Sequence, residues 1–323
     1  MSNLLTINVA IYNVEEYLPR CLDSLVNQTV SNYIVYAIDD GSTDSCGRIV
    51  DEYASRYPTK IVPMHKVNGG LSDVRNYGID KTYSDYIAFV DGDDYVEPDF
   101  VEKIMKQVDE HQPDILLFDF YQYHLEEDLR EVTTMDVIAD KDINIHSYKR
   151  LLAKCNNATW NKVYRTSLFK DNNIKFPDGY RHQDLGTTPK LLANAGKIRY
   201  LNQPLYDYIV DRPNNVTTTI DRKIYHILDM AEEVVKYYRD NGLFDEFKEE
   251  LYYLCSNNIA SSLRKAIRLK DGYFAEKFID DAFDFLEANF KGTRDRYHIR
   301  KDTGSIIYTK RNLCKFYYRY KNR

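Results

Sequence analysis

The sequence predicts an α/β fold in which a mainly parallel sheet is covered by helices on both faces. Three observations carry this prediction. Apolar, β-rich runs alternate with helical patterns over residues 4–120. The loops between them are short, as in sheets whose parallel strands are joined by crossover helices. Most of the runs also end in polar clusters, and ligands bind beyond the carboxyl ends of parallel strands.

The expected elements follow in order along the chain. The strands are predicted over 4–11, 33–38, 61–64, 86–90 and 114–120. The intervening helices are predicted over 14–27, from about residue 44, and over 71–79 and 98–111, the last opened by Pro98 in its first turn. From 126 to 145 the pattern weakens into a loop-like, acidic stretch. Beyond Thr217 it is helical throughout, over 220–241, 244–269 and 273–289.

The turn formers of Asp211-Arg212-Pro213-Asn214-Asn215 mark the expected domain boundary. They predict a first domain over 1–215 and a C-terminal helical region with a basic tail over 216–323. No run of about 18 apolar residues occurs, so no membrane span is expected. The N-terminus lacks the basic start of a signal peptide, and the five cysteines form no C-x-x-C pair. These features predict a cytoplasmic protein with reduced thiols.

The net charge of −6 conceals an asymmetry. The tail beyond Asp302 holds six basic residues and no acidic one, so residues 1–302 carry −12. An acidic body argues against nucleic acid as a partner. The basic, aromatic tail from Lys310 to Arg323 leaves two alternatives open. It is either a peripheral contact with anionic lipid at the inner face of the cell membrane or a solvated terminal helix.

Asp91-Gly92-Asp93-Asp94 places three carboxylates on the turn after a buried strand. Like charges this close repel one another unless a cation neutralises them. Hard oxygen ligands suit Mn²⁺ or Mg²⁺, with part of the coordination shell left for phosphate oxygens. The alternative is a solvated acidic turn. A calcium loop of the EF-hand type is excluded, because its glycine belongs at the sixth position.

Two other strand ends carry polar residues that admit two interpretations each. Asp39-Asp40-Gly41-Ser42 is a turn before a helix N-cap, or it offers a carboxylate to a nucleotide base or ribose. Tyr12 is a core residue or a stacking platform for that base. Arg75, after the Asn68-Gly69-Gly70 turn, is a surface ion-pair partner or a diphosphate ligand. No G-x-G-x-x-G follows the first strand, which argues against a dinucleotide site.

Together these segments resemble the successive signatures of family 2 glycosyltransferases of the GT-A fold. The similarity covers roughly residues 4 to 218. The matching segments are Ala10-Ile11-Tyr12-Asn13, Asp39-Asp40-Gly41-Ser42-Thr43-Asp44, Asn68-Gly69-Gly70-Leu71-Ser72-Asp73-Val74-Arg75-Asn76, Phe89-Val90-Asp91-Gly92-Asp93-Asp94-Tyr95, Trp160-Asn161-Lys162-Val163-Tyr164-Arg165, Gln183-Asp184-Leu185 and Pro204-Leu205-Tyr206-Asp207-Tyr208.

The resemblance implies a role for individual residues. The implied donor-binding residues are Ala10, Tyr12, Asp40, Asn68, Arg75, Asp91 and Arg212. Among them Tyr12 would stack on uracil and Asp40 would hydrogen-bond the base. Ala10 and Asn68 would line the pocket, Asp91 would approach the ribose, and the two arginines would hold base or diphosphate. Asp93 would bind Mn²⁺ or Mg²⁺, and Asp184 would be the general base.

The sequence departs from the family pattern at three places. Ala10-Ile11 stands where the family usually has Pro-Val, and Gln183 stands before Asp184 where it usually has Glu. Gly186 and Pro189 are expected to interrupt the helix that normally follows; alternatively Pro189 sits in a first turn capped by Thr187 or Thr188. No Gln-x-x-Arg-Trp motif occurs, so nothing indicates a processive synthase.

The resemblance implies a metal-dependent, inverting hexosyl- or N-acetylhexosaminyltransferase of bacterial polysaccharide, capsule or cell-wall synthesis. It would move sugar from a UDP-sugar to a hydroxyl of a glycan or undecaprenyl-linked acceptor. One rival is a nucleotidyltransferase that makes the donor, but the first strand is not followed by a glycine-rich, Lys/Arg-bearing loop. The other rival is a non-catalytic nucleotide-sugar-binding or scaffolding module with the same fold, which the departures around Asp184 leave open.

Overall fold

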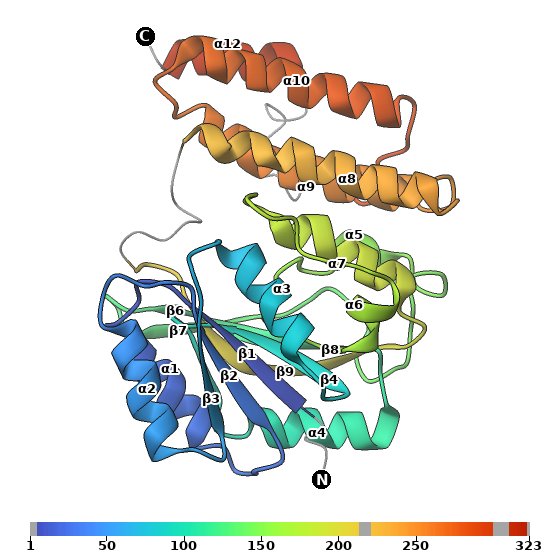
Figure 1. Ribbon diagram of the computed structural model, residues 1–323. Coiled ribbons are helices and arrows are strands. Elements are labelled where there is room, and N and C mark those ends of the chain that lie inside the picture. Colours follow the sequence, from blue (N-terminus) through green and yellow to red (C-terminus); the bar gives the residue numbers. More distant parts are fainter. Residues whose placement is uncertain (1–4, 213–220, 300–309, 322–323) are drawn as a thin grey trace. The chain divides into compact units, whose positions relative to one another are not determined.

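The computed structural model describes residues 5–212, 221–299 and 310–321 (Figure 1). The chain forms two compact units. The first comprises Met1–Asn144, Asn156–Gly179 and Leu191–Asn215, and the second comprises Ile145–Cys155, Tyr180–Lys190 and Val216–Arg323. The division at 215/216 stays a prediction, since the expected boundary lies partly outside the described residues. Two short segments from the middle of the chain belong with the C-terminal helices.

The first unit is built on a mixed sheet with the strand order β3-β2-β1-β4-β8-β6-β9-β5, and β7 pairs with β6 at the side. Its strands are β1 (Leu5–Ile11), β2 (Ile34–Asp39), β3 (Ile61–His65), β4 (Tyr86–Asp91), β5 (Tyr95–Val96), β6 (Ile115–His124), β7 (Leu129–Thr133), β8 (Lys162–Arg165) and β9 (Ile198–Ile209). Strands β1 to β4 are parallel, as is the long pair β6–β9. Strands β5, β7 and β8 pair antiparallel. The predicted α/β fold class is confirmed.

Helices of the first unit cover the sheet. They are α1 (Leu18–Val26), α2 (Cys46–Arg56), α3 (Leu71–Lys81), α4 (Phe100–His111) and α6 (Ser167–Asp171). Buried side chains of α1, α2 and α4 join one core cluster with the inner face of the strands. The buried Val74 and Ile79 of α3 lie outside that cluster, and Figure 1 shows α3 crossing the face of the sheet nearest the viewer. Burial on both faces explains the continuous apolar run of β4.

Local chemistry shifts the start of one predicted helix and adds one strand that was not predicted. The first helix begins at Leu18 rather than near residue 14, with a proline in its first turn. Asn13, which precedes it, has a positive φ of 50°. The stretch 126–145, predicted as a loop, contains β7, which pairs with β6 through Phe120↔Thr133 to His124↔Leu129. The mostly exposed, charged sequence of β7 carries no apolar alternation, so the pattern gives no strand signal there.

The second unit is helical, which confirms the predicted C-terminal helical region. After the short turn η1 (Arg222–Tyr225), its helices are α8 (His226–Asp240), α9 (Lys248–Ala266), α10 (Gly272–Phe290) and α12 (Arg311–Lys321). The middle of the chain adds α5 (Arg150–Lys154), which contacts α9. No helix in the described part of the chain is long and apolar enough to cross a bilayer.

Helix α7 (Gln183–Asn194) corrects one prediction. Gly186 and Pro189 do not interrupt it, and Pro189 lies well beyond its first turn. Residues 185–192 are all buried, so packing on several sides outweighs the hydrogen bond that the proline nitrogen cannot donate. The carbonyl of Pro189 accepts a 2.9 Å hydrogen bond from the hydroxyl of Tyr238.

Candidate functional site

The carboxyl ends of three parallel strands bring the predicted residues of the first unit to one edge of the sheet. Ala10 on β1 lies in register with Asp91 on β4, and Ile11 lies in register with Asp39 on β2. The amide of Gly92 donates to the carbonyl of Ala10 at 2.9 Å. A Cβ on Gly92 would lie 3.0 Å from that oxygen. The carboxylate turn and β1 are therefore in direct backbone contact, which only glycine permits without a shift.

Asp40 organises the loop that follows β3. Its carboxylate is buried and accepts hydrogen bonds from the amide of Gly69 at 2.9 Å and from the amide of Gly70 at 2.8 Å. Lys66 forms an ion pair with the same carboxylate at 2.6 Å. The side chain of Asn68 donates to the carbonyl of Asp40 at 3.0 Å. Asp40 and Asn68, predicted as neighbours in the base pocket, are thus joined directly.

The loop after β1 is fixed to the loop after β2. The side chain of Asn13 accepts from the amide of Thr43 at 2.8 Å, and the amide of Asn13 donates to the Ser42 hydroxyl at 3.1 Å. The amide of Glu15 donates to Asp44 at 3.0 Å. Tyr12 lies within this cross-linked segment, with 48% of its surface exposed. Its interpretation as a core residue is therefore wrong, since about half of its surface is exposed.

Arg75 is a buried residue of α3, not a member of a surface ion pair. Its side chain is 2% exposed, and it donates to the carboxylate of Asp91 at 3.1 Å. Its guanidinium also lies 5.4 Å from the centre of the Phe176 ring. A charge so deeply buried is tolerated only where hydrogen bonds and an opposite charge compensate it. Arg75 and Asp91, both predicted as donor-binding residues, are coupled in one ion pair.

Asp94 faces the protein interior. It is 1% exposed, and its two oxygens accept from the Tyr206 hydroxyl at 2.7 Å and from the amide of Ile209 at 2.9 Å. The same hydroxyl accepts from the amide of Asp91 at 3.1 Å. Burial, together with the charges of Asp93 and Asp91, holds the pKa of Asp94 well above its usual range. Asp94 therefore anchors the turn to β9, and the interpretation of this turn as a solvated acidic loop is wrong.

Asp93 is ion-paired with Arg212, which follows the end of β9. The side chain of Asp93 is 14% exposed and that of Arg212 is 17% exposed. Burial and then Glu16 raise the pKa of the Tyr17 hydroxyl, and smaller effects come from Arg212, which lowers it, and Asp93, which raises it. The structure thus brings Arg212 to the carboxylate turn, as expected of a residue that shares a ligand with it.

Of the three carboxylates on the turn, only that of Asp93 is suited to bind a divalent cation. Asp94 is turned inward and Asp91 is paired with Arg75, so Asp93 is the carboxylate placed to share a cation. The guanidinium of Arg212 already occupies a cation position beside it. Within 5–212, 221–299 and 310–321, no group of three His, Cys, Asp or Glu side chains is placed to bind a metal. One carboxylate suits Mg²⁺ or Mn²⁺ when diphosphate oxygens and water complete the shell.

Asp184 belongs to the second unit and lies in the first turn of α7. His182 opens that helix with a positive φ of 61°, and its carbonyl accepts from the amide of Leu185 at 2.9 Å. Burial, and then the charge of Lys265, lower the pKa of His182 to about 4, although Asp184 acts in the opposite direction. His182 is therefore neutral near pH 7.

Two residues that hold the site together were missed by sequence reasoning. Lys66 binds Asp40, and Tyr206 holds Asp91 and Asp94. Tyr206 had a signal, because it lies in a segment quoted for the family resemblance. Its ring stacks on Trp160 of another such segment, with centroids 4.6 Å apart. Nothing in the local pattern marks Lys66, whose partners lie 26 residues upstream and seven residues downstream.

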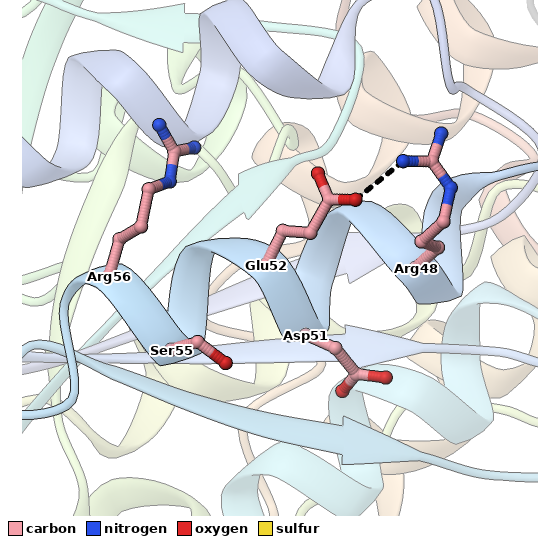
Figure 2. A pocket seen from close by; sticks show the side chains of 5 residues that line it. All are labelled: Arg48, Asp51, Glu52, Ser55 and Arg56. Atoms are coloured by element: carbon pink, nitrogen blue, oxygen red, sulfur yellow. Dashed lines mark hydrogen bonds and ion pairs between the residues drawn. The ribbon is translucent and has the colours of Figure 1, made fainter.

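A separate hollow lies on the outer side of α2. Figure 2 shows the side chains that line it, which are Arg48, Asp51, Glu52, Ser55 and Arg56. Arg48 and Glu52 form an exposed ion pair one helical turn apart. None of the predicted site residues lines this hollow, and its walls come from a single helix. It is a shallow feature of the solvated face of α2.

Known proteins resemble this chain over most of its length. The profile of Glycosyl transferase family 2 matches residues 6–181. The uncharacterized glycosyltransferase EpsJ of Bacillus subtilis is 30% identical over 275 residues, which are 82% of this chain and 79% of EpsJ. Glycosyltransferase GlyA of Streptococcus pneumoniae is 27% identical over 85% of this chain, which spans only 41% of GlyA.

The poly(ribitol-phosphate) beta-N-acetylglucosaminyltransferase TarS of Staphylococcus aureus is 29% identical over 215 residues, 63% of this chain and 35% of TarS. The structure of TarS residues 1–349 in complex with UDP-GlcNAc superimposes with a TM-score of 0.59 at 22% identity, covering 93% of this chain and 92% of that one. At that identity the superposition shows the shared fold. The family profile, which spans more than half of the chain, establishes membership: this chain belongs to glycosyl transferase family 2.

Proposed function

We propose that this protein transfers a sugar from a UDP-sugar to a hydroxyl of a glycan or lipid-linked acceptor in bacterial polysaccharide or cell-wall synthesis. The observation that carries the proposal is the convergence of Asp40, Arg75, Asp91 and Asp93 at one edge of the sheet, in a chain of family 2. UDP is the expected nucleotide because TarS, which shares the fold, is known in complex with UDP-GlcNAc.

The base pocket is assigned to the loops after β1, β2 and β3. In this proposal the partly exposed Tyr12 stacks on uracil, and Ala10 and Asn68 line the pocket. An ionised carboxylate has about four acceptor positions, and three of those on Asp40 are taken by Lys66, Gly69 and Gly70. We propose that the remaining one accepts from an N–H of the base, which requires the loop over this buried carboxylate to shift when UDP binds. In this proposal Asp40 both orders the loop after β3 and contacts the base.

The diphosphate is assigned to the carboxylate turn. In this proposal Asp91, which is paired with Arg75, contacts the ribose, and Asp93 and Arg212 contact the phosphates. Arg212 would exchange its contact with Asp93 for the diphosphate oxygens, which guanidinium groups bind in pairs. A Mn²⁺ or Mg²⁺ ion held by Asp93 and these oxygens would supply positive charge to the leaving diphosphate. The chain's own contribution is to fix Asp93 through the buried anchor of Asp94.

Transfer is assigned to Asp184 as the general base. Its carboxylate would take the proton of the acceptor hydroxyl while the oxygen bonds to the anomeric carbon and the bond to UDP breaks. A single displacement of this kind inverts the configuration and needs no second carboxylate. Asp184 is partly exposed in the first turn of α7, where a negative charge interacts favourably with the helix dipole.

A donor screen tests the function. UDP release is measured for the full chain with UDP-GlcNAc, UDP-glucose and UDP-galactose, each with Mn²⁺, Mg²⁺ or EDTA. We expect release from at least one donor, and a lower rate in EDTA. UDP binding without release from any donor, even with glycan acceptors present, would favour the non-catalytic binding module instead.

The assignment of the base is tested separately with Asp184→Asn. Losing a general base lowers turnover by about 10²–10⁴-fold, while UDP affinity should stay unchanged. Asp229→Asn is the matched control, because Asp229 is also an acidic residue in the first turn of a helix of the second unit. Retained turnover in Asp184→Asn would assign the base elsewhere.

A further inference from the structure

The cations of the C-terminal helix α12 are mostly committed within the protein. Arg319 binds Glu276 of α10 through two hydrogen bonds of 2.8 and 2.7 Å. Lys315 binds Asp280 at 2.6 Å, and Arg311 pairs with Asp284. Together with the buried Cys314 and Tyr318, these pairs hold one face of α12 against α10. The basic charge of the tail therefore serves internal contacts, and it is not by itself a lipid-binding patch.

The opposite face of α12 is apolar and open. Leu313, Phe316, Tyr317 and Tyr320 follow the spacing i, i+3, i+4 and i+7, which places them on one side of a helix. Phe316 is 70% exposed, Tyr320 is 72% exposed and Leu313 is 40% exposed. Scattered single apolar residues are normal on a protein surface, but a continuous stripe marks an interaction surface. We call these four residues the outer stripe of α12.

Basic residues lie beside the stripe at both ends of the helix. Lys310 precedes the first turn and Lys321 ends the last one, and both are exposed. In a helix of 100° per residue they fall between Tyr317 of the stripe and the buried Cys314, at the edge of the open face. No acidic residue occurs between 310 and 321. The open side of α12 is thus an aromatic stripe bordered by positive charge.

We propose that α12 lies in the interface of an anionic bilayer, with its outer stripe among the lipid headgroups and Lys310 and Lys321 facing their phosphates. Helices that bind at membrane surfaces combine an aromatic and aliphatic face with lysines at its edge. Tyrosine and phenylalanine suit the boundary between headgroups and acyl chains, and tyrosine keeps its hydroxyl in water. This inference does not depend on which sugar the enzyme transfers.

The small area of the outer stripe favours a lipid surface over a second copy of the chain as its partner. Three aromatic residues and a leucine, partly exposed, offer roughly 400 Å² at most, since a whole aromatic side chain buries about 150–250 Å². A stable protein interface needs about 800 Å² from each partner. A lipid surface has no such threshold, because the affinity grows with each apolar group inserted and each lysine near the surface.

Vesicle sedimentation of the full chain tests the proposal. We expect binding to vesicles of phosphatidylcholine with 30% phosphatidylglycerol, weaker binding to pure phosphatidylcholine, and a decrease with salt. The triple variant Leu313→Ser, Phe316→Ser, Tyr320→Ser should bind about tenfold more weakly or worse, because each group loses transfer free energy. Tyr273→Ser is the matched control, since Tyr273 on α10 is 82% exposed and lies outside the stripe. It should bind as the wild type does.

A fluorescence variant gives an independent readout. The chain has one tryptophan, Trp160, which is buried, so Phe316→Trp adds a reporter on the stripe. Its emission should shift to the blue on anionic vesicles, while that of the wild type stays constant. Vesicle binding that the triple variant retains in full would overturn the proposal. So would a wild type that ignores vesicles but forms a dimer which the triple variant loses, since a second copy would then cover the stripe.

Discussion

The guanidinium of Arg75 lies 3.1 Å from the carboxylate of Asp91, and the Arg75 side chain is only 2% exposed. The pair links α3 to the end of β4 underneath the carboxylate turn. Asp91 is itself in register with Ala10 on the neighbouring strand. The ion pair therefore joins the helix after the Gly69-Gly70 loop to β4, which lies next to β1 at the proposed donor site.

Replacing Arg75 with Met should destabilise the protein and weaken UDP binding. The change leaves the Asp91 carboxylate without its buried partner, and breaking such pairs costs about 3–5 kcal/mol. Urea unfolding and a UDP titration measure the two effects. Arg48→Met is the control, because the Arg48–Glu52 pair is exposed on α2 and such pairs contribute about 0–1 kcal/mol. Equal stability of the two variants would contradict the account of Arg75.

Gly92→Ala should lower activity through a small displacement of the carboxylate turn. The added Cβ would lie 3.0 Å from the carbonyl of Ala10 and 3.3 Å from Ile11 and Val14. Overpacking of this kind costs about 1–3 kcal/mol. At Gly196 the nearest atom to an added Cβ is 3.5 Å away, so Gly196→Ala is the control. Measured side by side, UDP release should fall in the first variant alone; an unaffected Gly92→Ala would show that the turn tolerates movement.

Tyr12→Ala should weaken UDP binding without loss of stability. The ring is 48% exposed, so little packing is lost, while stacking of a base on an aromatic ring is worth about 1–3 kcal/mol. The predicted loss of affinity is therefore roughly fivefold to 150-fold. Tyr83→Ala is the comparison, because Tyr83 is 88% exposed and precedes the opposite end of β4. If both variants bind UDP as the wild type does, the stacking role is refuted.

The buried Asp207 predicts a pH dependence of stability. Burial, and then Glu97, raise its pKa to about 7, although Arg130 acts in the opposite direction. In the unfolded chain an aspartate titrates near 3.9. Between about pH 4 and pH 7 the folded state therefore binds more protons at this residue, and its contribution to stability is lost as the pH rises.

Asp207→Asn should remove that contribution. The free energy of unfolding of the variant minus that of the wild type should rise from pH 4 to pH 7, by at most about 1.4 kcal/mol per pH unit. Glu97→Gln removes a neighbouring group that raises the pKa of Asp207. In that variant the loss of stability with rising pH should therefore begin at a lower pH than in the wild type. Urea unfolding at several pH values measures both changes, and a difference between variant and wild type that does not vary with pH would contradict this account.

Much of the fold could be predicted because buried strands and helices have characteristic patterns of apolar residues. The runs predicted over 4–11, 33–38 and 86–90 are strands in the structure, since both faces of the sheet are covered. β7 escaped prediction because its residues are mostly exposed and charged. The continuity of α7 through Pro189 was not predicted either, because packing there outweighs the low helix propensity of proline.

The sequence indicates which residues gather at the candidate site better than it indicates their burial and contacts. The carboxylate turn and Arg75 were visible in the sequence, but not that Arg75 is buried or that Asp94 faces inward to Tyr206. Those facts depend on partners far away in the chain, and spacing along the sequence carries no information about them. The same holds for Lys66, whose contact with Asp40 exists only because two loops meet at the sheet edge.

The central claim is that the carboxylate turn binds a UDP-sugar through Asp93, and a UDP titration with Mn²⁺ tests it most directly. We predict that the wild type binds UDP, that EDTA weakens this binding, and that Asp93→Asn removes the response to Mn²⁺. Asp99→Asn, at the N-cap of α4, should behave as the wild type does. Undiminished, Mn²⁺-dependent binding of UDP by Asp93→Asn would contradict the claim.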